Sequence, residues 1–242
     1  MDDIVSVNAE PSVKNPTLIE GFPGVGLIGN ITVQHLIEEL DMEQIGTVYS
    51  PLFPPIAILL EGIVNLPIRI YQSEELELVT VLSDIPILPN ATYPVAKSLI
   101  DWCEEIGGKE VVSVAGVSTM GEEHNVFGAA TTEDGLKKIS NAVSTFEIGS
   151  IAGISGGIIT ECYLRDVPAI ALLGETHTQR PDPRVAANVV EVLNKIMGMS
   201  IDTQKLHEQA EQIELEMHKL AEQVSRSEAE SALPKREFPM YG

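Results

Sequence analysis

The sequence predicts an α/β protein in which a mostly parallel β-sheet is covered by helices on both faces. Two observations lead to this fold class. The strand-like segments, such as 109–117 and 167–175, are continuous apolar runs, which is typical of strands buried on both faces. Strand-like and helix-like segments also alternate along the chain, as they do when helices connect parallel strands.

The elements follow one another in a regular order. Strands are predicted at 17–22, 44–50, 76–84, 109–117 and 167–175, with a β-rich stretch containing a hairpin at 55–74. Helices are predicted at 27–40, 93–107, 158–166 and 183–198, where apolar residues recur at helical spacing. Gly107 and Gly108 stop the second helix, and Asp182 and Pro183 are typical of the start of the last one.

Composition limits the classes of partner. The 242 residues carry a formal net charge of −21, and 44% of them are hydrophobic. Such a chain folds readily, but it is repelled by nucleic-acid backbones and anionic membranes, so we expect neither as a partner. The N-terminal segment has no signal-peptide pattern, and the apolar runs are too short to cross a membrane. We expect a cytoplasmic protein with two reduced, buried thiols, Cys103 and Cys162.

The chain divides into three parts: an α/β domain at 1–198, a C-terminal helix at 199–225 with Asp202 as its N-cap, and a flexible tail at 226–242. The helix carries an apolar seam with heptad spacing. The seam residues are Leu206, Ala210, Ile213, Met217, Leu220 and Val224. So narrow a stripe favours pairing between subunits, although a helix lying on its own domain would produce the same pattern.

A glycine-rich turn follows the first strand. Gly24, Gly26 and Gly29 have the spacing of a dinucleotide-binding turn. That site also needs a carboxylate at the end of the next strand, and the strand at 44–50 has none there. Tight turning and close packing explain the glycines without a ligand, so we predict no cofactor.

A second short motif raises the possibility of a hydrolase. Ser155 lies within G-x-S-x-G between a strand and a helix, where a nucleophile elbow would be. Asp166 and His177 follow in the order of a catalytic triad, but very close behind. A tight Gly-Ser-Gly turn is the more common explanation, and we predict no catalytic residue.

Two polar clusters could line a cleft. Glu175, His177, Arg180 and Asp182 lie in a loop after a buried strand, where α/β proteins often bind ligands. Asp182 is explained as the N-cap of the following helix. The roles of Glu175 and Arg180 are left open.

The other cluster is Glu122, Glu123 and His124. It lacks a second group of ligands at a suitable spacing, so no metal site is predicted.

The segments 19–40, 50–55, 152–176 and 181–196, taken in this order, resemble the PAC2 family, the proteasome assembly chaperone 2-like proteins of archaea. The resemblance covers roughly residues 1–198. It implies a three-layer α/β/α sandwich similar to the phosphorylase/hydrolase-like fold, followed here by the long C-terminal helix and tail. Members of the family share no agreed catalytic set.

The last three residues add to this resemblance. Met240, Tyr241 and Gly242 match the hydrophobic-Tyr-X tail of proteasome-activating ATPases and some assembly chaperones. The match implies docking between α-subunits of the proteasome core particle. The terminal carboxylate of Gly242 would pair with a lysine, the Tyr241 ring would fill an apolar slot, and Met240 would adapt to its wall.

The sequence therefore predicts a non-enzymatic assembly chaperone or ATP-independent activator that docks its tail on the proteasome α-ring. We expect a homo-oligomer, for example a tetramer, because several tails acting together gain avidity. The alternative is a hydrolase or a nucleoside-type, small-molecule-binding enzyme that uses the cleft around Gly24–Gly29 and Ser155.

Overall fold

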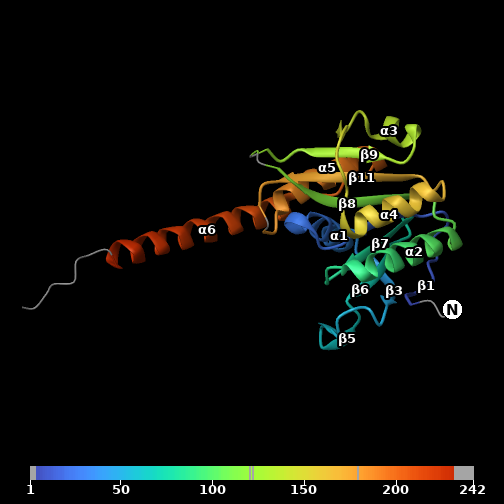
Figure 1. Ribbon diagram of the computed structural model, residues 1–242, viewed down its shortest axis with the longest axis horizontal. Helices are drawn as coiled ribbons and strands as arrows, with labels where there is room; N and C mark the ends of the chain where they lie inside the picture. Colours follow the sequence, from blue (N-terminus) through green and yellow to red (C-terminus); the bar gives the residue numbers. More distant parts are fainter. Residues whose placement is uncertain (1–3, 120, 122, 179, 232–242) are drawn as a thin grey trace, which may run out of the picture.

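A mixed β-sheet forms the middle layer of the protein and carries helices on both faces (Figure 1). The computed structural model describes residues 4–119, 121, 123–178 and 180–231. Within these residues, nine strands form the sheet in the order β1-β3-β6-β7-β2-β8-β11-β9-β10. Their bounds are β1 Ser6–Ala9, β2 Thr17–Gly21, β3 Glu43–Tyr49, β6 Ile68–Ser73, β7 Leu78–Ser83, β8 Glu110–Ser118, β9 Val126–Ala130, β10 Ser144–Thr145 and β11 Ala169–Thr176.

The sheet combines a parallel centre with largely antiparallel flanks. β2 pairs in parallel with β7 and β8, and β8 pairs in parallel with β11. The strands β1, β3, β6 and β7 pair antiparallel in succession, and β9 is antiparallel to β11. The edge strand β10 is parallel to β9. The prediction of a mostly parallel sheet thus holds for the centre, whereas the other flanking pairs are antiparallel. β6 and β7 are joined by a short turn, and a turn of that length can connect only antiparallel neighbours.

Each face of the sheet has its own apolar core. Helices α2 (Pro89–Glu105) and α4 (Gly153–Leu164) cover one face, and α1 (Ile28–Glu39) and α5 (Pro183–Met197) cover the other. Leu18 lies in the first core, and its neighbour Ile19 lies in the second. A single strand supplies both cores because successive side chains point to opposite faces. A short helix, α3 (Glu133–Ile139), lies near β9.

The start and end of α5 follow the sequence signals. The Asp182 carboxylate accepts a hydrogen bond from the Val185 backbone N–H at 3.2 Å. Pro183 occupies the first turn, and Gly198 ends the helix in the left-handed conformation with φ +70°. The predicted N-cap is confirmed.

Both cysteines are free and buried, as predicted. Cys103 belongs to α2 and Cys162 to α4, and these two helices pack on each other. Burial raises the pKa of the Cys162 thiol to about 12, so this thiol stays protonated near neutral pH.

A separate two-stranded sheet projects from the domain. It consists of β4 (Ile58–Leu60) and β5 (Ile63–Asn65), which pair antiparallel with Leu59 opposite Val64. Figure 1 shows this hairpin beyond the edge of the helical layers. The hairpin predicted in the β-rich middle is therefore present, and β6–β7 forms another.

The C-terminal helix α6 (Gln204–Ser231) runs away from the domain (Figure 1). Its 28 residues span about 42 Å at 1.5 Å per residue. The first helical carbonyl is that of Thr203, which accepts from the His207 N–H at 3.2 Å, so the N-cap lies one residue after the predicted Asp202. The Asp202 carboxylate accepts from the Gln204 backbone N–H at 2.9 Å and still contributes to the helix start. The helix continues past residue 225, the predicted boundary with the tail, to Ser231.

Candidate functional site

The glycine-rich turn after β2 serves close packing. Gly26 has φ +65° within the short helix η1 (Val25–Leu27), a conformation that favours glycine. A Cβ atom on Gly29 would lie 2.2 Å from the carbonyl oxygen of Val114, and one on Gly21 would lie 2.3 Å from that of Gly29. Such contacts exclude a side chain, so Gly21 and Gly29 let α1 approach the sheet directly.

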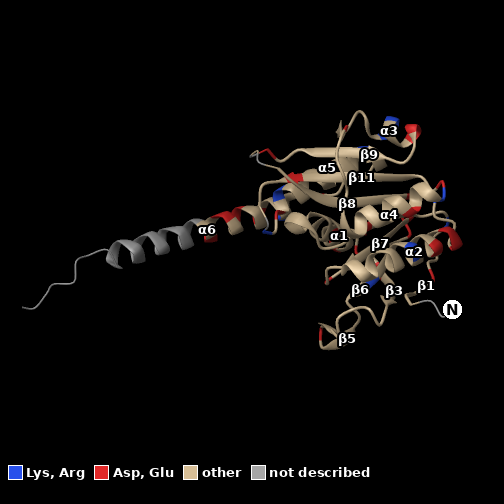
Figure 2. Ribbon diagram, in the orientation of Figure 1, with Lys and Arg blue, Asp and Glu red and all other residues tan. Residues whose placement is uncertain are grey.

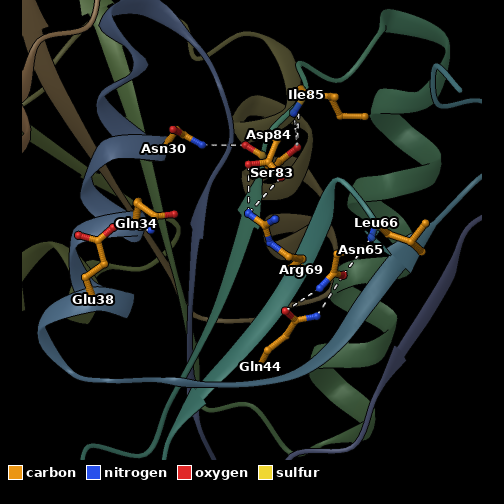
Figure 3. Close-up of polar contacts among 10 residues, drawn as sticks. All are labelled: Asn30, Gln34, Glu38, Gln44, Asn65, Leu66, Arg69, Ser83, Asp84 and Ile85. Carbon is orange, nitrogen blue, oxygen red and sulfur yellow. Dashed lines mark hydrogen bonds and ion pairs between the residues drawn. The ribbon is translucent and has the colours of Figure 1, made fainter. Parts of the chain in front are cut away.

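A pocket of about 500 Å³ adjoins this turn at the carboxyl ends of β2 and β7. Its lining residues are Pro23, Gly24, Leu27, Asn30, Asp84 and Pro86. Figure 3 shows that its polar groups have partners within the chain: Asn30 donates to the Ser83 carbonyl at 2.7 Å, and Arg69 pairs with Asp84 at 3.0 Å. A ligand entering the pocket would therefore compete with bonds that already exist.

A buried polar cluster lies at the centre of the sheet. Glu20 on β2 is fully buried, and its carboxylate accepts a hydrogen bond from the hydroxyl of Ser113 on β8. The Phe22 backbone N–H also donates to it, at 3.3 Å. Burial raises the pKa of Glu20 to about 7, although hydrogen bonds from Ser113, Ser155 and Phe22 lower it in part. This carboxyl can therefore hold a proton up to neutral pH.

Ser155 lies in the first turn of α4 and is buried beside Glu20. Its acidic neighbour is thus not Asp166, which lies beyond the end of α4. His177 instead packs against His124, with their ring centroids 5.9 Å apart. The residues of the triad hypothesis contact different partners, and the pockets described here are not lined by Ser155.

A second pocket, of about 490 Å³, lies between α6 and the loop after β11. His124, His177, Arg180 and Arg184 contribute to it, together with Ile213 and Met217 from α6. Asp182 also lines it, but its carboxylate is engaged by the Thr176 hydroxyl at 2.7 Å as well as by the α5 backbone.

The Glu175 carboxylate accepts from Asn125 at 2.9 Å. Glu122 lies outside the described residues. Among the residues that the structure describes, no group of three or more His, Cys, Asp or Glu side chains is placed to hold a metal ion.

The apolar seam of α6 begins inside its own domain. Leu206 and Ala210 are buried, and α6 packs there against α5. Lys205 pairs with Glu39 at 2.6 Å, and Glu214 pairs with Arg184 at 2.8 Å, so ion pairs also attach the helix to the domain. The side chains of Leu220 and Val224 lie outside the described part of the structure. Pairing of this seam between subunits stays a prediction.

The tail residues Met240, Tyr241 and Gly242 lie outside the described residues. In the part of the chain that the structure covers, no helix is both long and apolar enough to cross a membrane. Sequence reasoning missed Glu20 as a candidate functional residue. The available signal was a carboxylate inside an otherwise apolar strand, where an ionised group is costly.

The chain is similar to known proteins over nearly its whole length. Residues 18–221 match the model of the PAC2 family. The uncharacterized protein MJ0106 of Methanocaldococcus jannaschii is 33% identical over 233 residues, which cover 96% of this chain and 95% of the relative.

Two solved structures from Pyrococcus furiosus are similar throughout. PbaA, described as an archaeal homolog of proteasome-assembly chaperone, is 34% identical, with a TM-score of 0.85 over 94% of this chain and 95% of its own. PbaB, described as an archaeal proteasome activator, is 28% identical, with a TM-score of 0.78 over 90% of this chain and 98% of its own. The family model that covers residues 18–221, together with sequence identity above 30% over nearly the whole chain, shows that this chain belongs to the PAC2 family.

Proposed function

We propose that this protein is a non-enzymatic partner of the proteasome, acting as an assembly chaperone or as an ATP-independent activator. The observation that carries the proposal is the similarity to PbaA and PbaB, which covers at least 90% of this chain in each case. Because these two relatives are described by different roles, the proposal includes both assembly and activation.

The site supports a binding role rather than catalysis. Ser155, the candidate nucleophile of the G-x-S-x-G motif, is buried beside the Glu20 carboxyl. Ser155 lines neither of the two pockets described above, so a substrate bound in them would not reach its hydroxyl. We therefore take the phosphorylase/hydrolase-like fold that the sequence resemblance implies as a statement about architecture and not about an activity.

The mechanism we propose uses the C-terminal tail. Met240, Tyr241 and Gly242 would enter pockets of the proteasome α-ring, where the terminal carboxylate would pair with a cationic group and the Tyr241 ring would fill an apolar slot. Helix α6 supports this mechanism because it extends away from the domain (Figure 1). A tail that follows such a helix can reach a partner without a clash between the partner and the domain.

Binding to isolated α-ring by surface plasmon resonance tests the docking step. Tyr241→Ala should weaken binding at least tenfold, because an aromatic anchor is lost from the pocket. Residues appended after Gly242 should have a similar effect, since they move the carboxylate out of place. Gly242→Ala is the matched control, because it keeps the carboxylate in position and should bind as the intact chain does. Equal binding by the extended and intact chains would refute tail docking.

The alternative, a small-molecule-binding enzyme, is favoured by one observation: the glycine turn does adjoin a pocket, with Asp84 and Asn30 in its wall. A serine-reactive phosphonate separates the two proposals. Stoichiometric labelling of the intact chain, lost in Ser155→Ala, would support the hydrolase. No labelling, together with loss of α-ring binding in the Tyr241→Ala variant, would support the proteasome partner.

A further inference from the structure

The β4–β5 hairpin exposes apolar side chains on both of its faces. Leu59 and Val64 lie opposite each other, and each is 68% exposed. Leu60 and Ile63 form the next pair, in which Ile63 is 72% exposed. Opposite residues share a face and successive residues alternate, so the two pairs lie on opposite faces.

Exposing both apolar faces of this hairpin to water is energetically unfavourable. A strand that lies on a protein surface alternates apolar and polar residues, whereas a strand that is apolar on both faces is typical of one buried on both. An isolated two-stranded hairpin is also marginal in stability. The contiguous exposed apolar surface therefore indicates a contact with another molecule.

The hairpin is held in position at its base. The Asn65 amide donates to Gln44 on β3 at 3.0 Å, and the Gln44 amide donates back to Asn65 at 3.2 Å (Figure 3). The Leu66 backbone N–H donates to the same Asn65 side chain at 2.9 Å. These bonds order the hairpin before any partner arrives, which lowers the entropic cost of binding.

An apolar hollow lies beside the hairpin. It has a volume of about 490 Å³. Its lining includes Pro51, Phe53, Pro54, Pro55, Leu66 and Pro67. Each chain thus offers both an apolar projection and an apolar hollow, so two copies hold the complementary parts that an interface needs.

A second copy can meet this surface without bringing like charges together. Two copies of a chain with net charge −21 repel each other unless they meet where neither is charged. The 18 residues 51–68 contain one charged residue, Glu61. Figure 2 shows the hairpin with little colour, in contrast to the described base of α6, where acidic residues gather. Arg69, the next basic residue, is buried and paired with Asp84.

We propose that the β4–β5 hairpin inserts into the hollow of a second copy of this chain and forms the interface of a homo-oligomer. The insertion buries Leu59, Ile63 and Val64 away from water. Its consequence rests on the proposed function: an oligomer presents several tails to one α-ring and gains avidity.

Sedimentation velocity of the full-length chain tests the interface. We expect the intact chain at a multiple of 26.2 kDa. Val64→Glu would bury a charge between two anionic subunits and should raise the dissociation constant about a hundredfold or more. Ile148→Glu is the matched control, because Ile148 is 93% exposed and lies outside the hairpin; it adds the same charge and should sediment as the intact chain does.

Cross-linking provides a second measurement that does not depend on dissociation. A short bis-maleimide should join Leu59→Cys to Pro54→Cys when the two variants are mixed, and should not join Leu59→Cys to Ile148→Cys. The native thiols are buried and do not interfere.

Three results would overturn the interface. An intact chain that stays monomeric at every concentration would show that the hairpin meets a different protein. Equal masses of the intact chain and Val64→Glu, or equal dissociation by Val64→Glu and Ile148→Glu, would place the contact elsewhere. α-Ring binding is measured on the same samples: an intact oligomer that fails to bind refutes the proposed function and leaves the interface standing.

Discussion

At the centre of the sheet, the Glu20 carboxyl is fully buried between apolar strands, whereas on the β4–β5 hairpin Leu59, Ile63 and Val64 are mostly exposed. Both regions reverse the usual distribution of polar and apolar groups. Glu20 is stabilised within the chain, because Ser113, Ser155 and a backbone N–H donate to it. The hairpin side chains, by contrast, are not buried by any of the described residues around them. The buried polar groups are thus satisfied within the folded chain, whereas the exposed apolar groups are available for association.

The largest effect on folding is expected at another buried polar group. The Arg69 side chain is 4% exposed, and its partner Asp84 is 31% exposed. Asp84→Ala would leave the guanidinium buried without its anion and should lower the free energy of unfolding by about 4 kcal/mol. Urea denaturation measures this loss.

The exposed pair Lys137–Asp134 supplies the control, since Asp134→Ala should change the free energy of unfolding by less than about 0.5 kcal/mol. Similar losses in the two variants would remove the distinction between buried and exposed charges.

A smaller effect is expected from the pH dependence of Glu20. The pKa of this carboxyl is about 7 in the folded chain and near the ordinary 4.5 in the unfolded chain. Between these values the folded state holds the proton and the unfolded state releases it, so stability falls as pH rises from 4.5 to 7. The fall is on the order of 3 kcal/mol.

Denaturation of Glu20→Gln at several pH values isolates this contribution. The amide cannot ionise, so the loss of stability between pH 5 and 8 should largely disappear. Glu147→Gln changes an exposed carboxyl and should keep the slope of the intact chain. If Glu20→Gln kept that slope as well, the buried carboxyl would not be its cause.

The smallest effect on folding is expected on the hairpin. Leu59→Ser removes a side chain that already faces water, so the unfolding free energy of the monomer should change by less than about 0.5 kcal/mol. Leu18→Ala in the buried core should cost about 3 kcal/mol by comparison. Both substitutions are introduced into the Val64→Glu chain, and urea denaturation is measured at a concentration where that chain is monomeric. A large loss in Leu59→Ser would mean that the hairpin contributes to folding and not to association.

The elements that could be predicted from sequence are those with local signals. The N-cap Asp182, the first-turn Pro183 and the terminating Gly198 delimit α5 because capping acts between residues a few positions apart. The segment between β8 and α4 lacks such periodicity, and β9 and α3 were not predicted there. The antiparallel flanks of the sheet were also missed, since the pairing of β1 with β3 and of β9 with β11 depends on contacts between distant segments.

For the candidate sites, too, the sequence located single motifs, whereas contacts between distant segments decided their surroundings. The glycine spacing at 24–29 identified a tight turn, but only the approach of α1 to the sheet shows that Gly21 and Gly29 are there for packing. The G-x-S-x-G motif located Ser155, yet its neighbour Glu20 is 135 positions earlier in the chain. No periodicity relates two such residues. The heptad seam is likewise the same in sequence whether Leu206 and Ala210 meet their own domain or a second copy.

By itself, the sequence determined the α/β class, the buried strands, the limits of α5 and the resemblance to the PAC2 family, because these depend on hydrophobic period, local capping and the order of motifs. The tertiary structure alone decided the strand order, the burial of Glu20 beside two serines, the packing of the α6 base on α5, and the exposure of both faces of the hairpin. These features arise from contacts between segments far apart in the chain, and their energies depend on which groups are left in water after the whole chain has packed.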